Sequence, residues 1–393
     1  MMENDTTQQS LRAVYMRGGT SKGLFIDSRD LPREALDDPI IRDRLLLRLM
    51  GSPDPYGKQI DGLGGATPST SKVVLVSPST RDDCDVSYLF GAVSVDQALI
   101  DWSNNCGNLT TAVAPFALFA GLIPAMQDGI ATVRLWQANI GQRIIARLPV
   151  KNGQPVETGT FELDGVAFPS AEVRLEFLES DAGNTFPTGM VRQRLNLPGW
   201  GGFDVTLIKA GSPTAFVEAR ALDLVGTELQ PAFEGRTKLS ALIEAIRAHA
   251  AVAMGIAATP AEATERHPHT PRLALVAPSQ DYVSSAGRVI SASEIDLLVR
   301  IMSLGKLHHA MTGTGAVALA VAAAVPDTIV ARVLANGATP LVRFGHPSGT
   351  LTVGAQVSQA GHEWRADRVV MSRSARRLMA GSVFIPVGTL PRT

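Results

Sequence analysis

The chain has 393 residues, and its 36 lysines and arginines are balanced by 37 aspartates and glutamates, for a formal charge of -1 at pH 7. This balance excludes the strongly basic surface typical of nucleic-acid binders, and 45% hydrophobic residues over this length favour a globular protein of two domains. Two cysteines are too few for a disulfide framework, so we expect a reducing compartment, the cytoplasm.

The first segment in chain order, residues 1–19, is polar and lacks the apolar run of a secretory signal. The longest apolar run, GAVALAVAAAV from Gly315, is about half the length needed to span a bilayer. We therefore expect neither export nor insertion in a membrane.

Most of the chain reads as short strands separated by turns rich in Gly, Pro, Asn and Asp. Two segments that are apolar on nearly every side interrupt this pattern and predict enclosed helices. Two amphipathic helices are predicted on an outer face. The expected strands lie at 71–78, 84–96, 131–150, 171–180, 272–278 and 351–359, the enclosed helices at 108–123 and 315–325, and the amphipathic helices at 239–246 and 293–307.

The two halves of the chain look like divergent copies of one unit. A turn of small residues runs straight into an enclosed helix in each half, NNCGN in the first and AMTGTG in the second. A looser correspondence joins DGLGGATPSTSKVVLV with IKAGSPTAFVEA. The stretch ESDAGNTFPTG is the natural border, so we predict an N-terminal domain over 1–188 and a C-terminal domain over 189–372.

The two small-residue turns are candidate anion sites. A turn that opens a helix exposes unpaired backbone N–H groups beside the positive end of the helix dipole, and two such turns suggest a clamp for carboxylates. The same field favours the thiolate of Cys106, although a free cysteine is also commonly a small buried hydrophobe. Cys84 lacks this context and is interpreted as structural. The turn residues proposed to bind are Asn105, Gly107, Asn108, Thr312, Gly313, Thr314 and Gly315.

Lys72 is the second candidate for chemistry. It follows a run of small hydroxyl residues and opens a strand that should enter the core. Burial of an ammonium group favours its neutral form, which can act as a general base. An edge lysine that extends to solvent is the alternative.

A third candidate stretch is MRGGTSKG, which begins at Met16. Its Arg17, Gly19, Thr20 and Ser21 could bind a carboxylate, or the stretch could be a tight turn with a solvated Lys22. The histidines 308, 309 and 346 lie near the second turn in a spacing that fits no standard zinc site, so no metal is expected.

Six motifs together resemble the PrpF family, the 2-methylaconitate isomerases, over nearly the whole chain. They are AVYMRGGTSKGLFI, GSPDPYGKQIDGLGGATPSTSKVVLVS, DWSNNCGNLTTAVAPFA, KLHHAMTGTGAVALA, VRFGHPSGTL and MSRSARRLMAG. The resemblance implies an α+β, diaminopimelate-epimerase-like fold, in which each of two similar domains is a β-barrel-like sheet around a central α-helix. It also implies that the tail, 373–393, returns to the first domain and that the active site lies where the two helix starts face each other.

The resemblance further implies that Lys72 and Cys106 are the catalytic pair, with Ser71, Ser212 and His346 among the substrate-binding residues. Racemases of this fold carry a cysteine at both helix starts, whereas Thr312 stands at the second start here. A threonine hydroxyl is too weak a base for that role, so two-cysteine racemisation is not expected. No cofactor is implied.

The implied reaction is isomerisation of an unsaturated tricarboxylic acid, 2-methylaconitate, in the methylcitrate route of propionate catabolism. Removal of a proton from the carbon γ to the carboxylate would give a dienolate, which permits cis/trans rotation or an allylic shift. The alternatives are a 4-oxalomesaconate tautomerase, a 3-methylitaconate isomerase, or a non-catalytic accessory protein of an iron–sulfur methylcitrate dehydratase. Homodimerisation and coupling to that dehydratase are partner hypotheses.

Overall fold

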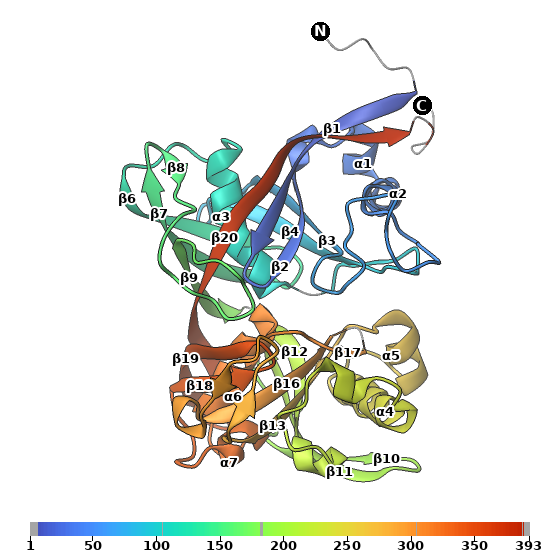
Figure 1. Ribbon diagram of the computed structural model, residues 1–393, viewed down its shortest axis with the longest axis vertical. Helices are drawn as coiled ribbons and strands as arrows, with labels where there is room; N and C mark the ends of the chain where they lie inside the picture. Colours follow the sequence, from blue (N-terminus) through green and yellow to red (C-terminus); the bar gives the residue numbers. More distant parts are fainter. Residues whose placement is uncertain (1–6, 104, 181–183, 304, 387, 389–393) are drawn as a thin grey trace.

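Hydrogen bonding connects eighteen strands of the described chain into one continuous sheet that folds into two lobes (Figure 1). The computed structural model describes residues 7–386 and 388, apart from 104, 181–183 and 304. No helix in these residues is long and apolar enough to cross a membrane.

The first lobe carries the N-terminal half of the chain (Figure 1). Its strands are β1 (Gln8–Gly18), β2 (Ser21–Asp27), β3 (Lys72–Pro78), β4 (Val86–Val93), β5 (Ile100–Asp101), β6 (Gly129–Gln137), β7 (Gln142–Lys151), β8 (Gln154–Pro155) and β9 (Glu172–Ser180). Its helices are α1 (Arg33–Asp37), α2 (Pro39–Met50) and α3 (Gly107–Phe119), with a 3₁₀ turn at Ser28–Asp30.

The second lobe carries most of the C-terminal half. Its strands are β10 (Gln193–Leu197), β11 (Gly201–Ala210), β12 (Ser212–Glu218), β13 (Arg272–Pro278), β14 (Tyr282–Val283), β15 (Val289–Ile290), β16 (Leu297–Ser303), β17 (Lys306–Leu307), β18 (Leu341–His346) and β19 (Gly349–Ala360). Its helices are α4 (Thr237–Ala253), α5 (Pro260–Arg266), α6 (Gly313–Ala324) and α7 (Ile329–Val333), with 3₁₀ turns at Ala219–Leu222, Gln230–Phe233 and Ala292–Glu294.

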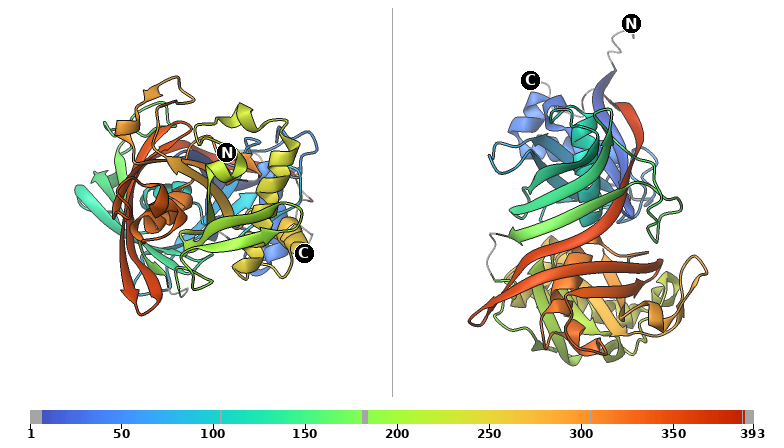
Figure 2. Two further views of the ribbon diagram at one scale, coloured as in Figure 1. Left: turned by 90° about the horizontal axis from the view of Figure 1, so that it is seen from below. Right: turned by 90° about the vertical axis from the view of Figure 1, so that its left-hand side faces the viewer.

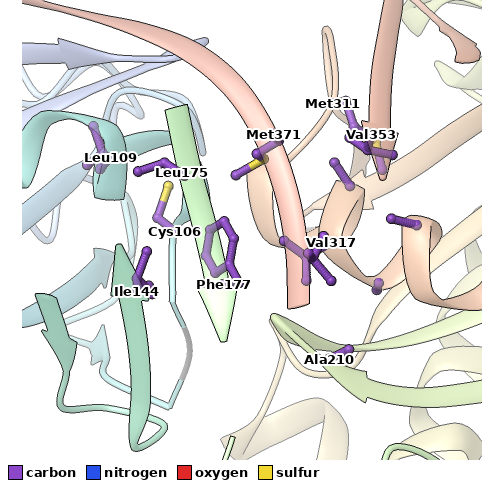
Figure 3. Packing of buried hydrophobic residues seen from close by; sticks show 14 of the residues in the cluster. Cys106, Leu109, Ile144, Leu175, Phe177, Ala210, Met311, Val317, Val353 and Met371 are labelled. Atoms are coloured by element: carbon purple, nitrogen blue, oxygen red, sulfur yellow. The ribbon is translucent and has the colours of Figure 1, made fainter. Parts of the chain in front are cut away.

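Each lobe wraps its strands around one buried helix, α3 in the first and α6 in the second (Figure 1). Residues 107–118 of α3 and 313–323 of α6 are all buried, as their uniformly apolar sequences predict. A single cluster of buried apolar side chains includes residues of both helices, with Met371 of the last strand between the two sides (Figure 3). The helices are therefore fixed relative to each other by a shared core.

The last strand, β20 (Glu363–Pro386), runs along both lobes (Figure 2). Its first part pairs with β19 and β9, and residues 375–386 pair antiparallel with β1. The rest of the predicted returning tail, residues 387 and 389–393, lies outside the described residues. The predicted border at residue 188 falls in the segment between β9 and β10, and the domain division itself stays a prediction.

The strand order repeats between the lobes. In the first, β2 runs parallel to β3, β3 antiparallel to β4, β4 parallel to β6 and β6 antiparallel to β7. In the second, β12, β13, β16, β18 and β19 follow the same sequence of parallel and antiparallel pairings. The expected correspondence of IKAGSPTAFVEA with the segment entering β3 is therefore wrong. That stretch forms the β11–β12 hairpin, whose counterpart is the β1–β2 hairpin.

The helix predicted over 293–307 is also wrong. Residues 297–302 form strand β16 and are all buried. The run is apolar without a strict period of two, because a strand covered on both faces needs no alternation. The other expected strands, both enclosed helices and the amphipathic helix around 239–246 are confirmed.

Candidate active site

The two central helices begin in backbone contact with each other. Cys106 caps the start of α3, and Thr312 caps the start of α6, where its Oγ1 accepts the Gly315 N–H at 3.2 Å. A Cβ added to Gly107 would lie 2.7 Å from the carbonyl carbon of Gly313, and one added to Gly313 would overlap the backbone of Gly107. Only glycine permits this approach, which brings the positive ends of both helix dipoles to one point.

Lys72 and Cys106 form a direct pair at this junction. Lys72 Nζ donates to Cys106 Sγ at 3.1 Å and to Ser21 Oγ at 3.4 Å. Lys72 is 7% exposed and Cys106 is 4% exposed. The position of Lys72 at the start of β3 thus points its side chain inward rather than out to a solvent-exposed edge.

The electrostatic surroundings favour the thiolate of Cys106. Burial acts to raise the pKa of this thiol, but the charge of Lys72 and the amide of Leu109 outweigh it, and the net pKa is lowered. At Cys84, burial and the neighbouring Asp83 carboxylate raise the thiol pKa instead. The two cysteines therefore differ in thiolate content although both are buried.

We expect iodoacetamide to modify Cys106 before Cys84 at pH 7. The pH midpoint of Cys106 alkylation should lie below about 8.5, the pKa of a free cysteine. Replacement of Lys72 by methionine should move the midpoint upward, because it removes the charge that stabilises the thiolate. Mass spectrometry of the modified peptides over a pH series measures both rates, and a Cys84→Ser variant isolates the Cys106 signal. Equal rates at the two thiols would contradict the assignment.

Two asparagines bracket the junction. Asn105 Oδ1 accepts from Tyr88 OH and from Thr110 Oγ1, both at 3.1 Å, while its backbone carbonyl accepts from Thr314 Oγ1 at 3.4 Å. Asn108 Nδ2 donates to Thr20 Oγ1 at 3.0 Å and to the Met311 carbonyl at 3.3 Å. Each asparagine therefore links α3 to the turn that precedes α6 or to the first turn of that helix.

A cavity of about 800 Å³ lies next to the pair. The two are linked by Ser21, whose hydroxyl accepts from Lys72 Nζ and which also lines the cavity. Arg17, Gly19 and Thr20 line it too, as does Arg376. Four residues of the MRGGTSKG stretch proposed to bind are thus together at one wall. The Arg17 guanidinium is held by protein groups, since it donates to the Gly19 and Ser374 carbonyls and to the Ser374 and Ser170 hydroxyls at 2.9–3.1 Å.

The proposed residues of the two helix-start turns do not belong to the described lining of this cavity. Three other proposed binding residues are buried and do not belong to it either. Ser71 Oγ accepts from Gln59 Nε2 at 2.8 Å. His346 Nδ1 accepts from the Ser348 amide at 3.2 Å, and burial with the nearby Arg373 charge lowers its pKa to about 3. Ser212 opens β12. The structure brings none of the three to the cavity wall.

Sequence reasoning did not assign a role to a histidine pair that the fold brings to the cavity. His308 Nδ1 accepts the Ala310 N–H at 3.1 Å, so its Nε2 carries the proton that faces Ser69 Oγ at 3.2 Å. Ser69 Oγ also lies 3.3 Å from Nδ1 of His309, which lines the cavity. Ser69 and His308 are 239 positions apart, so spacing along the chain carried no signal of this contact.

Sequence reasoning also missed Arg272, the first residue of β13, whose charge lowers the pKa of the Cys106 thiol. A cation at the start of a wholly apolar strand was the available signal, as at Lys72. In the part of the chain that the structure describes, no group of three or more His, Cys, Asp or Glu side chains is arranged to hold a metal ion.

Two lobes with enclosed helices that meet start to start over a buried lysine–cysteine pair define an isomerase of the diaminopimelate-epimerase-like fold. The chain belongs to the PrpF family: the PrpF protein model matches residues 8–386. A 2-methyl-aconitate isomerase of Cupriavidus necator is 52% identical over 388 residues, which cover 96% of this chain and 98% of the relative.

Solved structures agree with this assignment. A methylitaconate-delta-isomerase superimposes with a TM-score of 0.77 at 35% identity, covering 99% of this chain and 98% of that one. A hydroxyproline epimerase of Agrobacterium vitis superimposes with a TM-score of 0.53 at 15% identity, covering 96% and 93%, and shares the fold alone.

Proposed function

We propose that the protein is an isomerase of unsaturated tricarboxylic acids that acts on 2-methylaconitate. The observation that carries this proposal is the 3.1 Å contact between Lys72 Nζ and Cys106 Sγ at the point where two helix starts meet. The 52% identity to a 2-methyl-aconitate isomerase supports this substrate over methylitaconate, whose isomerase is 35% identical.

The proposed reaction begins with removal of a proton from an allylic carbon of the substrate. The electron pair of the broken C–H bond then spreads over the alkene and its carboxylate as a dienolate, in which the former double bond has single-bond character. Rotation, or return of a proton to a different carbon, completes the isomerisation. The Lys72–Cys106 pair is the proton acceptor and donor, because Lys72 Nζ donates to Cys106 Sγ and also to Ser21 Oγ, and Ser21 lines the cavity.

The charge of this intermediate needs a positive environment. The starts of α3 and α6 both direct their dipoles at the junction, and protonated Lys72 adds a positive charge there. Arg376 supplies a further cation at the cavity wall. An unsaturated polycarboxylate suits this environment better than the zwitterionic amino acids of the racemases, which also need a second thiol where Thr312 stands here.

The proposal includes a cytoplasmic place in propionate catabolism and functional coupling to an iron–sulfur methylcitrate dehydratase. A non-catalytic accessory role is the second candidate. It is less favoured, since a buried ion-pairing lysine and cysteine would serve no purpose in a passive binding protein, whereas proton transfer needs such a pair.

Proton NMR of the purified protein with 2-methylaconitate isomers in deuterated water tests the proposal. We expect interconversion of the isomers with deuterium incorporated at the carbon that is reprotonated. The matched control is the same reaction with Lys72→Ala protein. Stoichiometric binding without interconversion or exchange would favour the accessory role. Faster turnover of methylitaconate or 4-oxalomesaconate would show that this compound, rather than 2-methylaconitate, is the substrate.

A further inference from the structure

Cys106 and Lys72 are placed for a covalent reaction as well as for proton transfer. The Sγ and Nζ atoms lie 3.1 Å apart, and both side chains are buried, so the surrounding packing holds the two atoms together. The thiolate is the form of cysteine that oxidants attack, and the pKa of Cys106 is lowered. The pair therefore combines an oxidisable sulfur with an adjacent nitrogen nucleophile.

The second cysteine of the chain lies too far away to form a disulfide with oxidised Cys106. Strands β3 and β4 pair antiparallel, with Lys72 at one end and Pro78 opposite Val86 at the other. Cys84 precedes Val86 by two residues, so it lies at the end remote from Lys72. The length of β3 is about 20 Å, whereas a disulfide needs Cα atoms within about 7 Å. The fold thus brings no second thiol to Cys106.

The burial of Cys106 selects for small oxidants. Its side chain is 4% exposed and belongs to the shared apolar core (Figure 3). A bulky thiol such as glutathione is excluded from such a site, whereas hydrogen peroxide is close to water in size. Ser21, which accepts from Lys72 Nζ, lines the cavity and marks the side from which a small molecule reaches the pair.

Two nitrogen atoms of the protein contact the sulfur of Cys106. One is Lys72 Nζ, and the other is the backbone amide of Leu109, which donates to the thiol. The lone pair of an amide nitrogen is delocalised into its carbonyl group, so an amide is a poor nucleophile. The amine of Lys72 is therefore the group that an electrophilic sulfur meets.

We propose that the Lys72 amine condenses with oxidised Cys106 to form a reversible S–N cross-link. The thiolate sulfur first attacks one oxygen of a hydroperoxide. The O–O bond breaks, the sulfur is oxidised to a sulfenic acid, and hydrogen peroxide is reduced to hydroxide. The Lys72 nitrogen then attacks the sulfur, the S–O bond breaks, and the hydroxyl leaves with a proton of the amine as water. The product is a sulfenamide at the same oxidation level as the sulfenic acid.

The first step prepares the amine for the second. In the reduced pair Lys72 faces a thiolate, and an opposite charge favours the ammonium form. A sulfenic acid is neutral, so oxidation removes this partner, and burial of the side chain then favours the neutral amine. The neutral amine has the free electron pair that attack on sulfur requires.

The cross-link stops isomerisation while it preserves the sulfur. Both groups of the proposed acid–base pair are occupied by the S–N bond. Further oxidation to sulfinic and sulfonic acids, which is irreversible, needs a free sulfenic acid. Two thiol groups of a small reductant reverse the link, because they supply its two hydrogens and are themselves oxidised to a disulfide. The inference rests on the geometry of the pair and holds for any substrate of the enzyme.

Mass spectrometry of the full chain treated with hydrogen peroxide tests the cross-link. Remaining thiols are alkylated, and the protein is digested without reductant. We expect a joined pair of peptides with the mass of the two reduced peptides less two hydrogens. Trypsin should no longer cleave after Lys72, and dithiothreitol should restore both this cleavage and the free thiol. A Cys84→Ser variant should give the same joined peptides.

Lys72→Arg is the variant that separates charge from nucleophilicity. A guanidinium keeps the charge that favours the thiolate but stays protonated, so it has no free electron pair for the sulfur. In excess peroxide, Cys106 of this variant should pass to sulfinic and sulfonic acids and should not be recovered by dithiothreitol. The matched control is Lys22→Arg, the same replacement at another lysine of the cavity wall, which should form the cross-link as the wild type does.

The wild-type protein decides the proposal by itself, whether or not the variants fold. Sulfinic acid at Cys106 with Lys72 still open to trypsin would overturn it, and so would an unmodified Cys106. A link from Cys106 to the Leu109 amide or to Cys84 would also overturn it. These outcomes leave the isomerase proposal in place, because that proposal is tested by interconversion of isomers in a reducing buffer.

Discussion

Replacement of Lys72 by alanine should lower kcat/KM by roughly 10² to 10⁴, the range that general acid–base catalysis contributes. The variant loses the group that donates to Cys106 Sγ at 3.1 Å and the charge that stabilises the thiolate. An NMR assay of isomerisation measures the loss in kcat/KM, and circular dichroism checks that the variant is folded. Ser71→Ala is the neighbouring control for folding, because its hydroxyl is held by Gln59 away from the cavity lining.

Lys72→Arg discriminates between the two roles of this residue. A guanidinium keeps the positive charge but cannot give up a proton to act as a base. We expect Lys72→Arg to be nearly as inactive as Lys72→Ala. Turnover near the wild-type rate would show that the lysine supplies only charge and that the thiolate of Cys106 alone moves the proton.

The regular parts of the fold could be predicted from the sequence because their signals are local. The two uniformly apolar segments indicated α3 and α6 at nearly their observed bounds, and alternation located strands such as β6 and β7. Strand β16 was mistaken for a helix, since burial on both faces removes the alternation that distinguishes the two.

The candidate site was predictable only where its residues lie in distinctive local patterns. Cys106 and Thr312 stand in small-residue turns before enclosed helices, and both are found as helix caps. Arg272 was missed because its significance depends on which strand of one lobe matches which strand of the other. The strand pairings show that β13 corresponds to β3. The similarity of short turns that contain Gly and Ser had instead indicated that the segment entering β12 corresponds to the one entering β3.

The resemblance to a known family added what local patterns could not supply. It related Lys72 to Cys106, which are 34 positions apart and whose side chains meet in the structure. It also led to Ser71 and His346 as binding residues, although both are engaged by other protein groups in the described structure. Family patterns therefore locate the site well but do not say which polar groups remain free for a ligand.

The contact between the helix starts leaves no room for an added methyl group. In Gly313→Ala the new Cβ would overlap the backbone of Gly107 and come within 2.5 Å of the Asn108 amide nitrogen, so the helix starts must separate. A displacement of about 1 Å in an active site can cost roughly 10² in rate. We expect a loss of that size in kcat/KM, together with a changed pH midpoint for Cys106 alkylation.

Gly381→Ala is the control for this prediction, because Gly381 is exposed in β20 and a Cβ there would meet no atom within 4 Å. That variant should keep wild-type turnover and an unchanged Cys106 midpoint. If Gly313→Ala also keeps both values, close approach of the two helix starts is not what positions the Lys72–Cys106 pair. The pair would then be held by the packing of β3 and α3 within the first lobe alone, and the second lobe would contribute only to substrate binding.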